Sequence, residues 1–172
     1  MPDMLVRLYA LPDQNTILKD GYVVRRAAAY EKAVILQWIG QHFSTQWASE
    51  ADVAFSRQPI SCFLALAQER LVGFACYEAT CLGYFGPGGV LEAHRGQGLG
   101  TRLLLECLRA MKEMGYTYAI IGRVGPKEFY AKTVGAIEIP DSTPGIYTAP
   151  LDALHLTSDN LEGGMETREK RE

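Results

Sequence analysis

The stretch V-L-E-A-H-R-G-Q-G-L-G-T, which runs from Val90 to Thr101, decides the fold expected for this chain. An extended apolar segment ends here, glycines follow at three alternate positions (Gly96, Gly98 and Gly100), and a long amphipathic sequence begins. A glycine turn at the start of a helix gathers free backbone N–H groups and the positive end of the helix dipole. We therefore expect an anion cradle of the size of a phosphate or pyrophosphate at this turn.

The spacing of these glycines does not fit two common phosphate-binding motifs. A P-loop needs Lys followed by Ser or Thr after its last glycine, whereas Thr101 and Arg102 follow Gly100. A dinucleotide fingerprint, G-x-G-x-x-G, fails in both registers because Thr101 and Leu103 stand where its last glycine belongs. The pattern that is present is R-x-x-G-x-G, from Arg95 to Gly100.

Hydrophobic periodicity predicts strands and helices on both sides of this turn. Ser44 is the expected N-cap of the second helix, Gly115 the expected stop of the third, and Pro126 the expected first residue of the fourth. The expected strands cover 4–10, 22–26, 62–67, 71–77, 84–91, 118–124, 136–139 and 146–148, and the expected helices about 30–39, 44–55, 101–115 and 126–134. Early hairpins and a later strand–helix–strand crossover predict an α/β (α+β) fold, with a mixed, mostly antiparallel central sheet flanked by helices.

Length and composition indicate one ordinary globular unit. The chain has 172 residues, of which 48% are apolar and 22% charged, enough for one domain with a sizeable core. We expect this domain at residues 1–155, with its core at about 21–148, and a charged, disordered C-terminal tail at 156–172.

Charge, hydropathy and cysteine content narrow the functional classes. Lys and Arg number 17 against 20 Asp and Glu, so a net charge of −3 gives no basic field for a nucleic-acid partner. No stretch is long and apolar enough to span a membrane, and the four cysteines are expected as reduced core residues. We expect a cytoplasmic protein without nucleic-acid or membrane partners, and a homodimer is compatible with the sequence.

In its context, the glycine motif resembles the signature Q/R-x-x-G-x-G/A of the GNAT superfamily of acetyl-CoA-dependent N-acetyltransferases. The string H-R-G-Q-G-L-G at 94–100 is similar to the family's y-R-G-k-G-i-G, between a strand and a helix. One helix and one strand later, E-F-Y-A-K-T-V-G-A at 128–136 is similar to the family's l-Y-e-k-x-G-F segment. The resemblance covers about residues 21–147 and implies a single-domain GNAT fold, acetyl-CoA as cosubstrate and no metal.

The resemblance also implies a role for each matching residue. Val90 and Leu91 would offer backbone groups to pantetheine between two splayed strands, and Tyr130 would protonate the departing thiolate as general acid. The pyrophosphate would rest on the glycine turn, namely on Arg95, Gly96, Gln97, Gly98, Leu99, Gly100 and Thr101. An amine would attack the thioester directly while a strand N–H polarises the thioester carbonyl.

Two departures from the family pattern leave the general base open. Many members have an asparagine where this chain reads G-R-V-G-P at 122–126, and many have a glutamate where it reads Y-F-G-P at 84–87. Glu78, at the end of the preceding strand, is the tentative base and Asp141 the second candidate, although a surface role is the plainer interpretation of each. A proton route through bulk water would also serve if the bound amine is partly neutral.

The aromatic, uncharged residues Tyr84, Phe85 and Tyr147 favour a small acceptor. They suit a primary amine of a small molecule, such as an amino sugar, better than a polyamine, which would need clustered carboxylates. A non-catalytic acyl-CoA sensor and a protein N-acetyltransferase are the alternatives. Trp38 and Trp47 are interpreted as core residues, with the acceptor cleft as the other option.

Overall fold

A computed structural model of the chain describes residues 1–13 and 17–147. The predicted tail at 156–172 lies outside these residues, as does Thr148 at the end of the last predicted strand. No helix in the described ranges has the length and apolar character needed to cross a bilayer.

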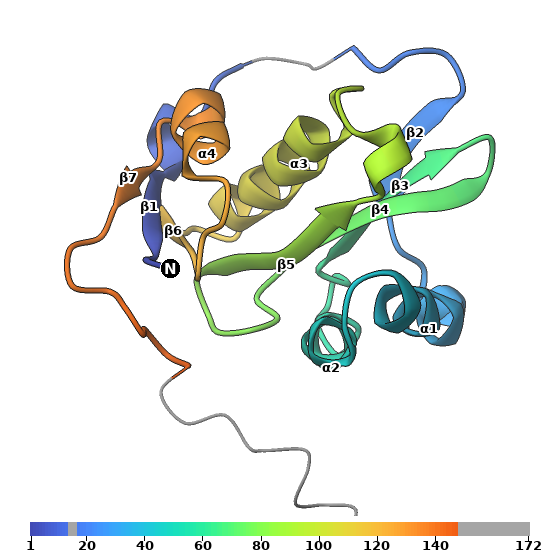
Figure 1. Cartoon of the computed structure of the whole chain (residues 1–172), viewed down its shortest axis with the longest axis horizontal. Helices are drawn as coiled ribbons and strands as arrows, with labels where there is room; N and C mark the ends of the chain where they lie inside the picture. Colours follow the sequence, from blue (N-terminus) through green and yellow to red (C-terminus); the bar gives the residue numbers. More distant parts are fainter. Residues whose placement is uncertain (14–16, 148–172) are drawn as a thin grey trace, which may run out of the picture.

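In this part of the chain, seven strands form one sheet in the order β2-β3-β4-β5-β6-β1-β7 (Figure 1). Every neighbouring pair is antiparallel except β5 and β6, which run parallel. This arrangement confirms the mixed, mostly antiparallel sheet. The strands are β1 Met4–Arg7, β2 Tyr22–Arg26, β3 Cys62–Ala67, β4 Arg70–Tyr77, β5 Tyr84–Val90, β6 Tyr118–Ile121 and β7 Ile137–Glu138.

Helices cover both faces of the sheet, with α1 and α2 on one face and α3 and α4 on the other (Figure 1). The helices are α1 Lys32–His42, α2 Thr45–Ala54, α3 Leu99–Glu113 and α4 Lys127–Val134, and the short 3-10 turns are η1 Leu8–Ala10, η2 Ala29–Glu31 and η3 Glu92–His94. The sequence of β3 shows how both faces of the sheet are buried. Cys62 and Leu64 join the core under α1 and α2, while Phe63 and Ala65 join the core under α3. Side chains alternate between faces along a strand, so β3 is apolar at every position.

The helix ends follow local chemistry. The Oγ of Ser44 accepts a hydrogen bond from the Trp47 N–H at 3.0 Å, which confirms Ser44 as the cap of α2. Gly115, at φ +97°, follows the last turn of α3 and stops it as predicted. Pro126 differs from the prediction, because it is the N-cap of α4 rather than its first helical residue.

Two predicted strands end three residues earlier than expected. The first ends at Arg7, where the chain enters η1 and the Leu8 N–H donates to the Thr117 carbonyl at 3.0 Å. β6 ends at Ile121, because the Arg123 N–H turns to the Asp3 carboxylate at 2.9 Å instead of continuing a ladder.

The prediction of a strand at 146–148 is wrong for its described residues. Ile146 lies in a turn and Tyr147 lies in no strand. The turn brings the Tyr147 ring under the Arg123 guanidinium, whose Cζ lies 4.7 Å from the ring centroid. The segment is used for this contact rather than for sheet pairing.

All four cysteines are free, and Cys62, Cys76 and Cys107 are buried. Burial raises the pKa of the Cys76 and Cys107 thiols, which keeps them protonated and unreactive. The prediction of reduced core cysteines is confirmed for these three, whereas Cys81 is partly exposed.

Candidate functional site

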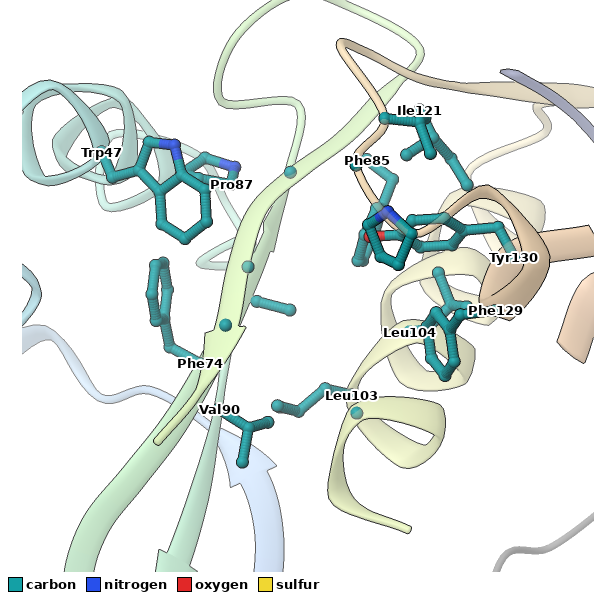
Figure 2. Close-up of a pocket in the computed structure, with 18 of the residues that line it drawn as sticks. Trp47, Phe74, Phe85, Pro87, Val90, Leu103, Leu104, Ile121, Phe129 and Tyr130 are labelled. Carbon is teal, nitrogen blue, oxygen red and sulfur yellow. The ribbon is translucent and has the colours of Figure 1, made fainter. Parts of the chain in front are cut away.

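A cavity of about 1030 Å³ opens where β5 and β6 diverge. Its walls come from α2, β5, the glycine turn, the start of α3, the loop after β6, and α4. Figure 2 shows β5 crossing the cavity, with Trp47 and Phe74 on one side and Phe129 and Tyr130 on the other. This volume lies at the upper end of small-molecule sites, about 300–1000 Å³, and so fits an extended ligand.

The divergence of the two strands leaves one edge of β5 unpaired. β5 pairs with β6 only at Tyr84 and Phe85. Further along, the Leu91 N–H donates to the Val72 carbonyl of β4 at 2.9 Å, and neighbouring residues on a strand point their backbone groups in opposite directions. The Val90 N–H therefore points into the cavity, where an amide-containing ligand can pair with it as an added strand would.

Leu91 differs from its predicted role. Its N–H is donated to Val72, and its carbonyl accepts the His94 N–H at 2.9 Å. Leu91 does not line the cavity, whereas Val90 does. The Val90 carbonyl already accepts a hydrogen bond from the Arg95 Nε at 3.2 Å, so Val90 offers its N–H to a ligand.

The glycine turn forms the predicted cradle. In the described part of the chain, no backbone N–H of residues 96–101 donates a hydrogen bond. Gly96 at φ +73° and Gly98 at φ +82° take the left-handed conformation that lets these N–H groups converge. All predicted cradle residues line the cavity except Gln97. The free N–H groups stand at the positive end of the α3 dipole, which suits an anion.

Tyr130 reaches the cavity from the middle of α4. Its ring packs edge-on against Phe129, with centroids 5.0 Å apart, and against Phe85 at 6.3 Å. No hydrogen-bond partner of the Tyr130 hydroxyl occurs among the described residues, and Figure 2 shows this hydroxyl directed toward β5. Burial raises the pKa of Tyr130, so the group keeps its proton at neutral pH and can donate it.

The two carboxylates considered as bases lie away from the cavity. Glu78 is only 2% exposed. Its Oε1 accepts the Gly83 N–H at 2.5 Å, and its Oε2 accepts the Tyr116 hydroxyl at 3.0 Å. Both oxygens thus fix the loop between β4 and β5, and neither Glu78 nor the exposed Asp141 lines the cavity. The geometry gives these carboxylates no access to a bound amine.

Sequence reasoning missed Glu50 and Arg123. Glu50, from α2, is the one carboxylate among the described residues that lines the cavity, and Arg123 lines it from the loop after β6. The only signal for Glu50 was its place one helical turn after Trp47, whose alternative interpretation was the acceptor cleft. Trp47 does line the cavity, and Trp38 does not. No signal pointed to Arg123.

No group of three or more His, Cys, Asp or Glu side chains in residues 1–13 and 17–147 is arranged to hold a metal ion. The groups that the cavity offers to a ligand are backbone N–H groups, the Tyr130 hydroxyl and the side chains of Glu50 and Arg123.

The family of the chain follows from comparison with known proteins. The model of the acetyltransferase (GNAT) family matches residues 33–136, more than half of the chain, a range that contains the glycine turn and Tyr130. The chain belongs to this family. No curated protein is significantly similar to it in sequence.

Solved structures share the fold at low sequence identity. The GCN5-related glucosamine N-acetyltransferase region of a fungal multi-domain GH3 β-N-acetylglucosaminidase gives a TM-score of 0.66 at 15% identity, over 80% of this chain and 19% of that one. A GCN5-related N-acetyltransferase from Sphaerobacter thermophilus gives 0.60 at 18% identity, over 80% and 48%. One from Kribbella flavida gives 0.55 at 19% identity, over 80% and 53%. The chain thus spans between about a fifth and about half of the length of these proteins.

Proposed function

We propose that this chain is an acetyl-CoA-dependent N-acetyltransferase that acetylates a primary amine of a small molecule by direct attack. One observation carries this proposal. The glycine turn with its free N–H groups, the unpaired edge of β5 and Tyr130 all line the same cavity. These three features match, in order, the diphosphate, the amide-containing arm and the thiol end of coenzyme A.

The residues divide the chemistry between them. The Val90 N–H is oriented toward the gap where the arm would lie, and an N–H on this edge can polarise the thioester carbonyl. The acceptor nitrogen forms a bond to the carbonyl carbon and loses a proton that finally reaches solvent, while the carbon–sulfur bond breaks. Tyr130 gives its proton to the departing thiolate, a role that its raised pKa permits at neutral pH. Holding both substrates in one cavity supplies much of the rate through proximity.

The lining of the cavity supports a small acceptor, with an amino sugar as one option. Tyr84, Tyr147 and Trp47 present flat rings with polar groups, which suits a hydroxyl-bearing ring that stacks and forms hydrogen bonds. We also propose a cytoplasmic location, because free thiols are typical of a reducing compartment. A homodimer stays compatible with this function.

Titration calorimetry with coenzyme A and a thiol-release assay across a panel of primary amines test the proposal. We expect coenzyme A to bind and at least one amine to release thiol from acetyl-CoA. Tyr130→Phe should lower kcat by about 100-fold, within the range known for general acids, because the thiolate then leaves without its proton. The dissociation constant of coenzyme A should stay within about twofold, since the hydroxyl acts in the transition state.

Tyr30→Phe is the matched control, because Tyr30 is 88% exposed and does not line the cavity. It should leave both quantities unchanged. A chain that does not bind coenzyme A would contradict the proposal outright. Binding without thiol release for any amine would instead favour a non-catalytic acyl-CoA sensor.

A further inference from the structure

An acidic and a basic side chain line the cavity near the start of β5, whereas the glycine turn follows the end of that strand. Glu50 lies there on α2, and its Oε2 accepts the Thr80 hydroxyl at 2.6 Å while its Oε1 accepts the Gln46 side-chain amide at 3.3 Å. Both donors are neutral, and no ion pair to Glu50 occurs among the described residues. Thr80 thus orients a carboxylate that lines the cavity.

Arg123 supplies the positive charge. Its backbone is fixed, because its N–H donates to the Asp3 Oδ1 at 2.9 Å and the next N–H, of Val124, donates to the Pro2 carbonyl at 2.9 Å. The residue has a φ of +46°, a conformation that costs a side-chain-bearing residue free energy and that clusters at functional sites. Its guanidinium lies 4.7 Å from the centre of the Tyr147 ring and forms no ion pair in the described part of the chain.

Tyr147 lies within reach of both charges. Burial raises the pKa of Tyr147, and the charge of Glu50 raises it further, whereas a hydrogen bond with Thr80 and the charge of Arg123 lower it. The Arg123 guanidinium thus covers one face of the ring, Glu50 lies near enough to influence the Tyr147 hydroxyl, and no ion pair between Glu50 and Arg123 occurs among the described residues. A cavity wall that carries an acidic and a basic group, unpaired with each other, is complementary to a molecule that carries both charges.

We propose that the acceptor carries an anionic group in addition to its amine, with Glu50 binding the ammonium and Arg123 binding the anion. This inference rests on the proposed function, since it names the substrate class of that site. The shared chemistry is an amine together with a carboxylate or a phosphate. Arg123 binds either through the paired N–H donors of its guanidinium.

The same arrangement gives the amine a route for its proton. The acceptor enters as an ammonium ion, R–NH₃⁺, and transfers one proton to the Glu50 carboxylate. Glu50 passes this proton to solvent, and the neutral nitrogen then forms the bond to the acetyl carbon as the carbon–sulfur bond breaks. The departing thiolate takes the Tyr130 proton, the new amide nitrogen loses its second proton to Glu50, and Tyr130 regains a proton from solvent. Glu50 thus touches the acceptor, whereas Thr80 acts through Glu50 as a positioning residue.

Matched acceptor pairs test the inference on the full-length protein with saturating acetyl-CoA. One pair is an amino acid and its amide, and the other is glucosamine 6-phosphate and glucosamine. We expect the anionic member of at least one pair to show a kcat/KM about tenfold or more above its neutral partner, which is the effect of one charge-assisted hydrogen bond. The pair that shows this preference distinguishes a carboxylate from a phosphate.

Variants assign the effect to each charge. Arg123→Met should remove the preference for the anionic member. Arg123→Lys should keep part of the preference, because lysine has the positive charge but lacks the paired N–H donors of the guanidinium. Glu50→Gln should lower kcat/KM for both members by about tenfold or more and shift the rise of the pH–rate profile to higher pH. The controls Arg70→Met and Glu113→Gln remove the same charges at exposed sites outside the cavity and should change nothing.

The outcomes separate this inference from the proposed function. If neutral amines react as well as their anionic partners, or if Arg123→Met leaves the preference intact, the inference fails while the acetyltransferase stands. If no member of either pair reacts but another amine does, the inference fails in the same way. If coenzyme A does not bind, the proposed function itself fails.

Discussion

Replacing Gly89 with Ala tests how tightly the aromatic wall of the cavity rests on β5. A Cβ at Gly89 would lie 2.5 Å from the Cε1 of Phe43 and 2.8 Å from its Cζ, about 0.9 Å inside the 3.4 Å at which ordinary contact begins. Phe43 cannot retreat freely, because its ring is stacked on Trp47 at 5.4 Å and lies edge-on to Phe74 at 5.5 Å. Either the wall or β5 must move.

Overpacking of this kind typically costs about 1–3 kcal/mol, and we expect Gly89→Ala to lower the free energy of unfolding by about 2 kcal/mol. For a chain of this size, that corresponds to a fall in Tm of about 4–8 °C. The affinity for coenzyme A should fall as well, because Gly89 lies next to the Val90 N–H on the unpaired edge of β5. Thermal unfolding and calorimetric titration measure the two effects.

A double-mutant cycle with Phe43→Leu assigns the cause, because leucine lacks the ring atoms that the new Cβ meets. The two substitutions should be non-additive by about 1 kcal/mol or more, with the double variant less destabilised than the sum. Gly40→Ala is the control. Gly40 lies inside α1, and a Cβ at this position would be 3.8 Å from the Cβ of Ala48, which is an ordinary contact. It should stabilise the protein by about 0.5–1 kcal/mol. Additive costs in the cycle would refute the steric argument.

Three further substitutions probe charged groups. Hydrogen bonds from Arg25 lower the pKa of Glu31 from 4.5 to about 2, so Glu31 stabilises the fold above pH 4.5 and loses this effect as the pH falls toward 2. Glu31→Gln should therefore lower the free energy of unfolding by about 1 kcal/mol at pH 7, a value discounted for solvent screening, and should leave it unchanged near pH 2. Urea unfolding across pH measures this difference. Glu78→Gln should cost about 1–3 kcal/mol because one of its two accepted hydrogen bonds is lost, and the pH dependence of kcat should be unchanged; a shifted profile would reinstate Glu78 as a base. Arg95→Ala should raise the dissociation constant of coenzyme A about tenfold at low salt and less at high salt, and an effect equal at both would exclude a phosphate contact.

Local sequence patterns predicted the parts of the site that depend on neighbouring residues. The glycine turn was predicted because Gly96 and Gly98 must take left-handed conformations and the start of α3 must leave its N–H groups free. Tyr130 was predicted from a motif confined to one helix. Both lie on elements whose local conformation is settled within about ten residues, and the fold then brings the two elements to one cavity.

The base and the acceptor end could not be predicted in this way. Glu78 follows an apolar strand and resembles a residue at a strand end that faces a site, yet its oxygens are taken by Gly83 and by the distant Tyr116. Glu50 and Arg123 lie 73 positions apart in the numbering, and they face one cavity only because α2 and the loop after β6 converge on it. The residues next to Glu50 in the sequence do not indicate that Arg123 lies near it, and the reverse is also true.

By itself, the sequence determined the class of fold and the conformation of the glycine turn, because hydrophobic periodicity, caps and positive φ angles act over a few residues. Only the tertiary structure decided which charged side chains line the cavity and which form hydrogen bonds that stabilise loops. That decision depends on contacts between segments far apart along the chain, such as the Asp3 carboxylate that fixes the Arg123 backbone and so turns its guanidinium over Tyr147.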